Sequence, residues 1–129
     1  MNNAIIRMVI CFCLILAACG QEEPPSAPPE IQSTGTIVAM GDSLTEGLGV
    51  PEEKTYPALL QKALRDKGYD YRVVNAGISG ETSSGARSRI GWVLRMKPDI
   101  VILETGANDG LRGLDPELIR RNIRDIVDA

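Results

Sequence analysis

Three short clusters carry the residues of this 129-residue chain that could do chemistry. The first, Gly-Asp-Ser-Leu, offers the hydroxyl of Ser43 as a nucleophile. The second, Asn-Ala-Gly, offers the backbone N–H of Gly77, where the missing Cβ permits the close approach of a substrate. The third, Gly-Ala-Asn-Asp, offers the side-chain amide of Asn108. A hydroxyl nucleophile beside N–H donors that face a developing oxyanion is the set of groups that catalyses acyl transfer.

Each cluster also has an ordinary structural interpretation when it is taken alone. A Gly-Asp-Ser segment is more often a helix cap or an Asx turn than a nucleophile. Gly77 fits a turn, and an Asn in Asn-Asp-Gly commonly organises a loop. Glu104 and Asp109 are the carboxylates that could replace a histidine base, but we favour structural roles for both. The conjunction of the three clusters, and not any one of them, indicates a site.

The composition restricts that chemistry. The chain contains no histidine, so its own residues supply no histidine base, no histidine metal ligand and no complete Ser-His-Asp triad. The cysteines are Cys11, Cys13 and Cys19, which leaves the remainder without a thiol for zinc or for nucleophilic attack. We therefore expect no metal and no cofactor. With 14 Lys and Arg against 17 Asp and Glu, no basic field favours nucleic acid.

Every cluster directly follows a predicted strand. Short apolar runs predict three strands, over residues 36–40, 71–75 and 99–104. Helical periodicity predicts three amphipathic helices, over residues 56–67, from residue 82 or 83 to the residues before Pro98, and from Asp115 onward. Strands that alternate with helices predict an α/β fold with a parallel sheet. Because the carboxyl ends of parallel strands form one crevice, we expect the three clusters to converge there.

The N-terminus has the layout of a signal peptide, with Arg7 before an apolar run that ends in small residues. This run is shorter than the roughly 20 residues that cross a bilayer. Leu-Ala-Ala-Cys19 resembles the lipobox of bacterial lipoproteins, in which the cysteine is lipidated and becomes the first mature residue. The resemblance implies a signal peptide over residues 1–18 and a lipid anchor at Cys19. A plain secretory signal with a chance cysteine is the alternative.

Residues 19–35 then form a linker that is rich in proline and favours an extended spacer. A lipid anchor places the protein at the bacterial cell envelope, facing the periplasm. Gly20 after the cysteine, by the same resemblance, favours the outer membrane. The expected partners are this membrane and a small-molecule ester or thioester, and no nucleic acid.

The clusters, in this order, resemble the first three sequence blocks of the SGNH or GDSL hydrolase superfamily. The likeness extends to the branch of arylesterases, lysophospholipases and the multifunctional acyl-CoA thioesterase I, and it rests on residues 41–47, 56–60, 74–82 and 106–114. It implies a flavodoxin-like three-layer sandwich with a central parallel sheet, of which residues 36–129 are the N-terminal portion. It also implies roles for three residues: Ser43 as nucleophile and first oxyanion donor, Gly77 as a backbone N–H donor and Asn108 as a side-chain donor.

The family draws its catalytic acid and base from a later Asp-x-x-His block, which this chain does not contain. A serine hydroxyl without a positioned base is a poor nucleophile, so we expect the chain alone to be close to inert and to be part of a longer polypeptide. The longer protein would hydrolyse esters or thioesters through an acyl-enzyme. Leu48, Val50, Ile78 and Leu111 flank the expected crevice and are candidates to receive an acyl chain.

Two other functions remain open. A descendant that lost its base could keep the crevice and bind lipids or acyl groups without turnover. A carbohydrate acetylesterase would share the same blocks. We favour the arylesterase, lysophospholipase or thioesterase type because the Gly-Leu-Arg-Gly-Leu extension after Asn108 resembles that branch more closely. The natural substrate stays open.

Overall fold

The computed structural model describes residues 34–129. The predicted signal peptide, Cys19 and nearly all of the predicted linker lie outside the described residues. The sheet contains three parallel strands in the order β2-β1-β3: β1 (Gly35–Gly41), β2 (Tyr71–Gly77) and β3 (Ile100–Leu103). All three predicted strands are therefore confirmed. At the carboxyl end Gly41 pairs with Gly77, and Met40 pairs with Leu103.

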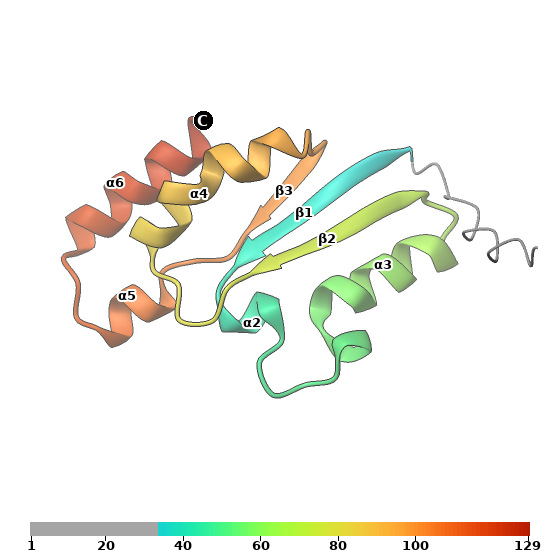
Figure 1. Cartoon of the computed structure of the whole chain (residues 1–129), viewed down its shortest axis with the longest axis horizontal. Coiled ribbons are helices and arrows are strands. Elements are labelled where there is room, and N and C mark those ends of the chain that lie inside the picture. The colour runs from blue at the N-terminus through green and yellow to red at the C-terminus, as the bar shows by residue number, and fades with distance from the viewer. Residues whose placement is uncertain (1–33) are drawn as a thin grey trace, which may run out of the picture. The chain divides into compact units, whose positions relative to one another are not determined.

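Three long helices match the predicted ones: α3 (Tyr56–Asp66), α4 (Ser83–Arg95) and α6 (Pro116–Val127). Their caps explain where they begin, because the side chains of Thr55, Thr82 and Asp115 each accept a hydrogen bond from a backbone N–H of the first turn. The helix α3 lies on one side of the sheet, and α4 and α6 lie on the other (Figure 1). This arrangement is the expected three-layer α/β sandwich.

The core lies between the sheet and the α4–α6 pair. Val38 and Met40 of β1 are fully buried there, because alternate residues of a strand point to the same face. They pack in one cluster with Ala86 and Val93 of α4 and with Ile126 of α6. The residues that alternate with them on β1, Ile37 and Ala39, are also buried. Burial on both faces is what a central parallel strand requires.

Three short helical segments differ from the expected turns and loops: α2 (Ser43–Glu46), η1 (Glu52–Lys54) and α5 (Ala107–Leu111). Segments of three to five residues are too short to show an apolar periodicity, so the sequence pattern does not reveal them. Leu111, which we expected on a loop, is the last residue of α5.

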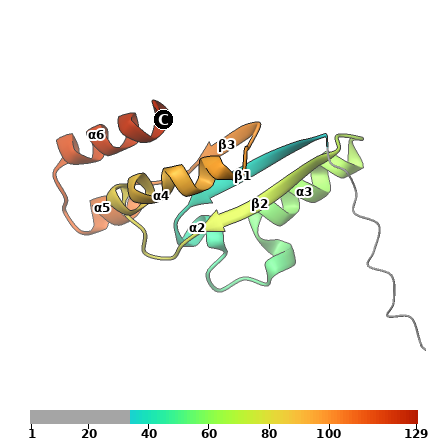
Figure 2. The same ribbon diagram turned by 45° about the horizontal axis from the view of Figure 1, so that its top comes forward.

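The three strands end at the same edge of the sheet. Figure 1 and Figure 2 show α2, α5 and the loop that enters α4 gathered at this edge. The expected convergence of the three clusters is thus confirmed, which brings Ser43, Gly77 and Asn108 to one end of the molecule's sheet. No helix within residues 34–129 is long and apolar enough to cross a membrane.

Candidate functional site

Ser43 is the first residue of α2, and one residue, Asp42, separates it from the end of β1. The preceding Asp42 is buried and caps this helix, because its Oδ1 accepts the Leu44 N–H at 3.0 Å. The cap interpretation of Gly-Asp-Ser therefore holds for Asp42. The capping role of Asp42 is compatible with a nucleophilic role of Ser43, because the cap fixes the turn that holds the Ser43 hydroxyl. Ser43 is itself partly accessible to solvent.

Asn108 lies in α5, in the segment that follows β3. Its Nδ2 donates to Oδ2 of Asp42 at 2.9 Å. The two oxygens of one buried carboxylate thus hold both the helix of Ser43 and the side chain of Asn108. A carboxamide has two N–H donors, so one donor of Asn108 remains for a substrate oxygen.

Gly77 ends β2 and packs against α2. A Cβ at this position would lie 2.0 Å from the Glu46 nitrogen and 2.5 Å from its Cα, so backbone fills the space that a substrate was expected to use. The Gly77 N–H donates to Oδ1 of Asn75 at 3.0 Å. The role of Gly77 as an oxyanion donor stays a prediction, and it requires the Asn75 side chain to move away.

Gly80 is a second glycine in the same loop, and the sequence reasoning above does not single it out. Its N–H donates none of the hydrogen bonds found within residues 34–129. Its φ of +76° favours glycine, and a Cβ there would meet only the Arg112 side chain, at 3.6 Å. Its position in the sequence, three residues after Gly77 in a strand-to-helix loop, could have identified Gly80 as a second candidate donor.

The Gly80 loop is tied to the helix of Ser43. The Glu46 carboxylate of α2 accepts hydrogen bonds from both the backbone N–H, at 2.9 Å, and the hydroxyl of Ser79. On the other side, Arg112 Nη2 donates to the Gly80 carbonyl oxygen at 2.7 Å. A free N–H in a loop fixed on both sides is a preorganised donor, which is what stabilisation of an oxyanion needs.

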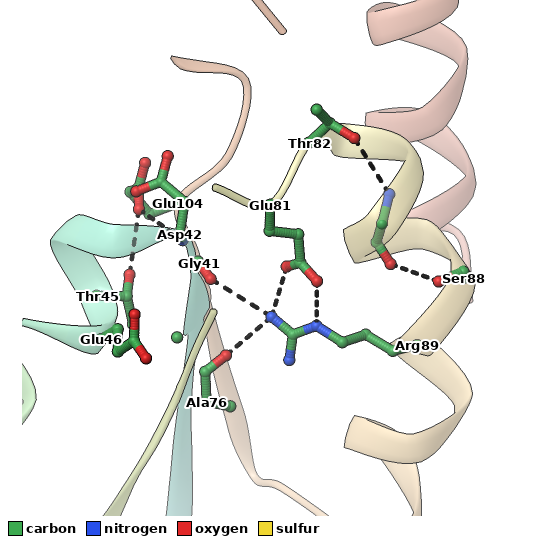
Figure 3. Close-up of polar contacts among 12 residues, drawn as sticks. Gly41, Asp42, Thr45, Glu46, Ala76, Glu81, Thr82, Ser88, Arg89 and Glu104 are labelled. Carbon is green, nitrogen blue, oxygen red and sulfur yellow. Dashed lines mark hydrogen bonds and ion pairs between the residues drawn. The ribbon is translucent and has the colours of Figure 1, made fainter. Parts of the chain in front are cut away.

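Glu104 supports the turn between β1 and α2. Its Oε2 accepts from the Asp42 N–H and from the Thr45 hydroxyl, each at 3.2 Å (Figure 3). The hydroxyl oxygens of Thr45 and Tyr56 are 3.1 Å apart. A Cβ on Gly41 would lie 2.1 Å from Thr45 Oγ1, so only glycine leaves room for these contacts. This agrees with the structural role that we favoured for Glu104.

Asp109 connects the Asn108 segment to α4. It is completely buried, and its two carboxylate oxygens accept from the N–H and the hydroxyl of Ser83, at 2.7 and 2.6 Å. Asn122 of α6 donates to the same Ser83 hydroxyl at 3.0 Å. With both oxygens engaged, Asp109 is a structural carboxylate of the kind that we favoured.

The four apolar candidates for acyl-chain contact, Leu48, Val50, Ile78 and Leu111, are all exposed. They come from the segment after α2, the loop after β2 and the end of α5, which are the same segments that carry the polar groups. Their role in substrate binding stays a prediction. Within residues 34–129 no three His, Cys, Asp or Glu side chains gather in a way that could hold a metal ion.

The arrangement combines a hydroxyl on a capped turn, a side-chain amide that is anchored by one N–H, and a loop with an unpaired backbone N–H. Groups of this kind can form and stabilise a tetrahedral intermediate at a carbonyl carbon. These residues come from segments that are far apart in the chain, and hydrogen bonds that the carboxylates of Asp42 and Glu46 accept hold them together. The geometry therefore fits acyl transfer.

Comparison with known proteins shows which proteins the chain resembles. The chain is 48% identical over 93 residues to Esterase TesA of Pseudomonas aeruginosa, a match that covers 71% of this chain and 46% of that protein. It is 36% identical over 124 residues to an arylesterase of Vibrio mimicus, a match that covers 95% of this chain and 56% of that protein. The chain thus spans about half the length of the curated relatives it matches.

The fold is similar to that of AlinE4, whose crystal structure is described as that of an SGNH-hydrolase family esterase. The TM-score is 0.69 at 41% sequence identity, over 77% of this chain and 54% of AlinE4. The model of the GDSL-like lipase/acylhydrolase family matches residues 39–129, which include all three clusters as well as Gly80. The chain therefore belongs to the GDSL-like lipase/acylhydrolase family.

Proposed function

We propose that the protein hydrolyses carboxylic esters or thioesters through an acyl-enzyme formed on Ser43. The observation that carries the proposal is the Asp42 carboxylate, which joins the Ser43 helix to the Asn108 side chain across 66 residues of sequence. The relatives named esterase and arylesterase support the same reaction class.

In the proposed reaction Ser43 Oγ attacks the carbonyl carbon and gives its proton to a general base. The tetrahedral oxyanion accepts hydrogen bonds from the Ser43 N–H, from Asn108 Nδ2 and from one glycine N–H. The C–O or C–S bond then breaks, and the leaving alcohol or thiol takes the proton. Water attacks the acyl-enzyme in the same way and releases the carboxylic acid. Residues 1–129 contain no histidine, and we propose that the base comes from the Asp-x-x-His block that the family resemblance implies.

Two glycines are candidates for the backbone donor. Gly77 follows from the sequence, but its N–H is engaged by Asn75. Gly80 has a free N–H in a loop that Glu46 and Arg112 hold. We therefore propose Gly80 as the donor, with Gly77 as the glycine that lets α2 approach β2. Amide chemical shifts distinguish the two, because a bound oxyanion analogue should move the Gly80 N–H resonance strongly and the Gly77 resonance little.

The test uses the protein produced from its whole gene and a short p-nitrophenyl ester. Ser43→Ala should lower kcat by at least about 10³-fold, because no other group can form the acyl-enzyme. Ser88→Ala is the matched control, since Ser88 is an exposed residue of α4 whose hydroxyl bonds only the Gly85 carbonyl. A fluorophosphonate should add its mass to the unaltered protein and not to Ser43→Ala. Unchanged turnover in Ser43→Ala would contradict the proposal.

The same assay separates the other two functions. A carbohydrate acetylesterase should lose activity sharply with acyl chains longer than acetyl, whereas an enzyme that uses the exposed apolar residues around the site should not. A non-catalytic binding protein should bind fatty acids with neither turnover nor fluorophosphonate labelling.

We also propose that the protein is anchored to the bacterial cell envelope by lipid on Cys19. The Leu-Ala-Ala-Cys19 segment supports this location, as does the proline-rich linker that follows it. Cells grown with labelled palmitate should incorporate the label into the unaltered protein and not into Cys19→Ser, whereas Cys13→Ser should incorporate it normally. Equal labelling of the unaltered protein and Cys19→Ser would contradict the anchor.

A further inference from the structure

Arg89 of α4 joins three chain segments that surround the candidate site (Figure 3). Its Nη2 donates to the Ala76 carbonyl at 2.8 Å and lies 3.4 Å from the Gly41 carbonyl oxygen. Its Nε and Nη2 also donate to the two carboxylate oxygens of Glu81, each at 2.6 Å. The side chains of Arg89 and Glu81 are only 14% and 8% exposed. This is an internal ion pair, unlike the other three pairs in residues 34–129, whose side chains are about half exposed or more.

Each of these partners is next to a group of the proposed reaction. Gly41 precedes the Asp42–Ser43 turn. The Ala76 carbonyl belongs to the same peptide unit as the Gly77 N–H, and Glu81 directly follows Gly80. One guanidinium therefore fixes the approaches to Ser43 and to both candidate backbone donors. These segments have no other single side chain in common in the hydrogen bonds of residues 34–129.

The peptide between Gly41 and Asp42 is held from both ends. Its carbonyl oxygen faces Arg89, and its N–H donates to Oε2 of Glu104 at 3.2 Å. A cation at the oxygen and an anion at the N–H both align with the peptide dipole, so each contact strengthens the other. These contacts orient the peptide plane that leads into the Asp42–Ser43 turn.

The ion pair is formed in a way that lysine could not reproduce. A guanidinium is a planar fork with five donors, and it can bind a carboxylate through two parallel N–H groups while it also reaches a carbonyl. Gly85 makes room for the arrangement, because a Cβ there would lie 2.9 Å from Cγ of Glu81. Arg87 is the contrasting arginine of the same helix. It pairs with Asp125 at the surface, where its side chain is 56% exposed.

We propose that Arg89 is a positioning residue of the active site, which holds the Ser43 turn and the Gly77–Gly80 loop in the geometry that acyl transfer needs. The proposal rests on the proposed function. Arg89 acts through the Gly41 and Ala76 carbonyls and through Glu81, and it contacts no reacting atom. Small errors in the placement of catalytic groups cost about 100-fold in rate, so loss of the fork should lower kcat more than it changes KM.

The experiment compares Arg89→Lys with Arg87→Lys, the same substitution two residues earlier on the same helix. Both are made in the protein produced from its whole gene. We expect Arg89→Lys to lower kcat by roughly 10- to 100-fold with KM within about twofold. Hydrogen exchange should become faster in residues 41–46 and 76–82 and stay unchanged in α6. Arg87→Lys should change neither. If Arg89→Lys fails to fold, Glu81→Gln takes its place, because glutamine keeps the shape of the glutamate side chain. The same changes in kcat, KM and hydrogen exchange are then expected.

Unchanged kcat and exchange in Arg89→Lys would overturn the proposal. So would faster exchange throughout the domain, because Arg89 would then support the fold as a whole and not the site. If the unaltered protein neither hydrolyses esters nor reacts with a fluorophosphonate, the proposed function fails. The exchange data then decide alone: faster exchange confined to the two segments supports the positioning role, and unchanged exchange overturns it.

Discussion

At the scale of single residues, buried carboxylates organise the site. Asp42 connects the Ser43 helix to Asn108, Glu81 orients Arg89, and Asp109 connects α5 to α4. Each has its oxygens engaged by donors, which is the condition under which a buried carboxylate stabilises a fold. The residues proposed to react with the substrate are therefore positioned by carboxylates that take no part in the reaction themselves.

Asp109→Asn tests this arrangement. A carboxamide has a single oxygen where the carboxylate has two, so its NH₂ group would face the N–H or the hydroxyl of Ser83. Because the site is completely buried, we expect the free energy of unfolding to fall by about 1–3 kcal/mol. Urea denaturation measures it. Asp66→Asn, at an exposed pair with Lys62, is the control and should change stability by less than about 0.5 kcal/mol. Equal effects of the two substitutions would contradict this account.

The residues differ in how far sequence could predict them. Ser43 and Asn108 follow strands inside recognisable clusters, so their convergence was predictable from the parallel sheet alone. The hydrogen bonds from Ser83 to Asp109 and from Asn108 to Asp42 span 26 and 66 residues. No local pattern encodes such pairs. The ion pair of Arg89 with Glu81 is not predictable for another reason, since Glu81 lies in the loop before the N-cap of α4 and helical periodicity does not extend to it.

At the scale of elements, the length of a helix determines whether the sequence pattern can predict it. The helices α3, α4 and α6 have 11 to 13 residues, enough for an apolar face and a cap to be recognised. The helices α2 and α5 have four and five residues, and their conformation depends on tertiary contacts such as those of Asp42 and Asn108. The elements that carry the site are thus the ones that sequence periodicity could not show.

Glycine substitutions distinguish two effects on stability: close packing between two elements, and the backbone entropy of a glycine within a helix. Gly77→Ala places a Cβ 2.0 Å from the Glu46 backbone, so α2 must shift and we expect a loss of about 1–3 kcal/mol in the free energy of unfolding. The shift also moves the helix of Ser43, so fluorophosphonate labelling should slow.

Gly91→Ala is the control for that substitution. Gly91 lies inside α4 with nothing within 4 Å of its would-be Cβ, so alanine there should stabilise the protein by about 0.5–1 kcal/mol. Urea denaturation measures both variants. If Gly77→Ala proves as stable as the unaltered protein, α2 is not packed on β2 as closely as described.

At the scale of the whole molecule, β3 is one of the two edge strands of the sheet in residues 34–129. Within residues 34–129, β3 pairs with β1 and with no other strand. Beside it a cavity of about 270 Å³ is lined by apolar residues of α4, β3 and α6, among them Leu94, Val101 and Val127. A free strand edge next to accessible apolar side chains is a surface on which chains associate.

Association through β3 is therefore expected when residues 34–129 are produced alone. Ile100 is 45% exposed on this strand, and a lysine there should weaken strand pairing between copies at little cost to the fold. Sedimentation velocity should show a concentration-dependent oligomer for the unaltered polypeptide and mostly monomer for Ile100→Lys. Leu59→Lys, at an exposed leucine of α3, is the control and should leave the oligomer unchanged. A monomer at every concentration would contradict this prediction and would mean that the short edge of β3 does not pair between copies.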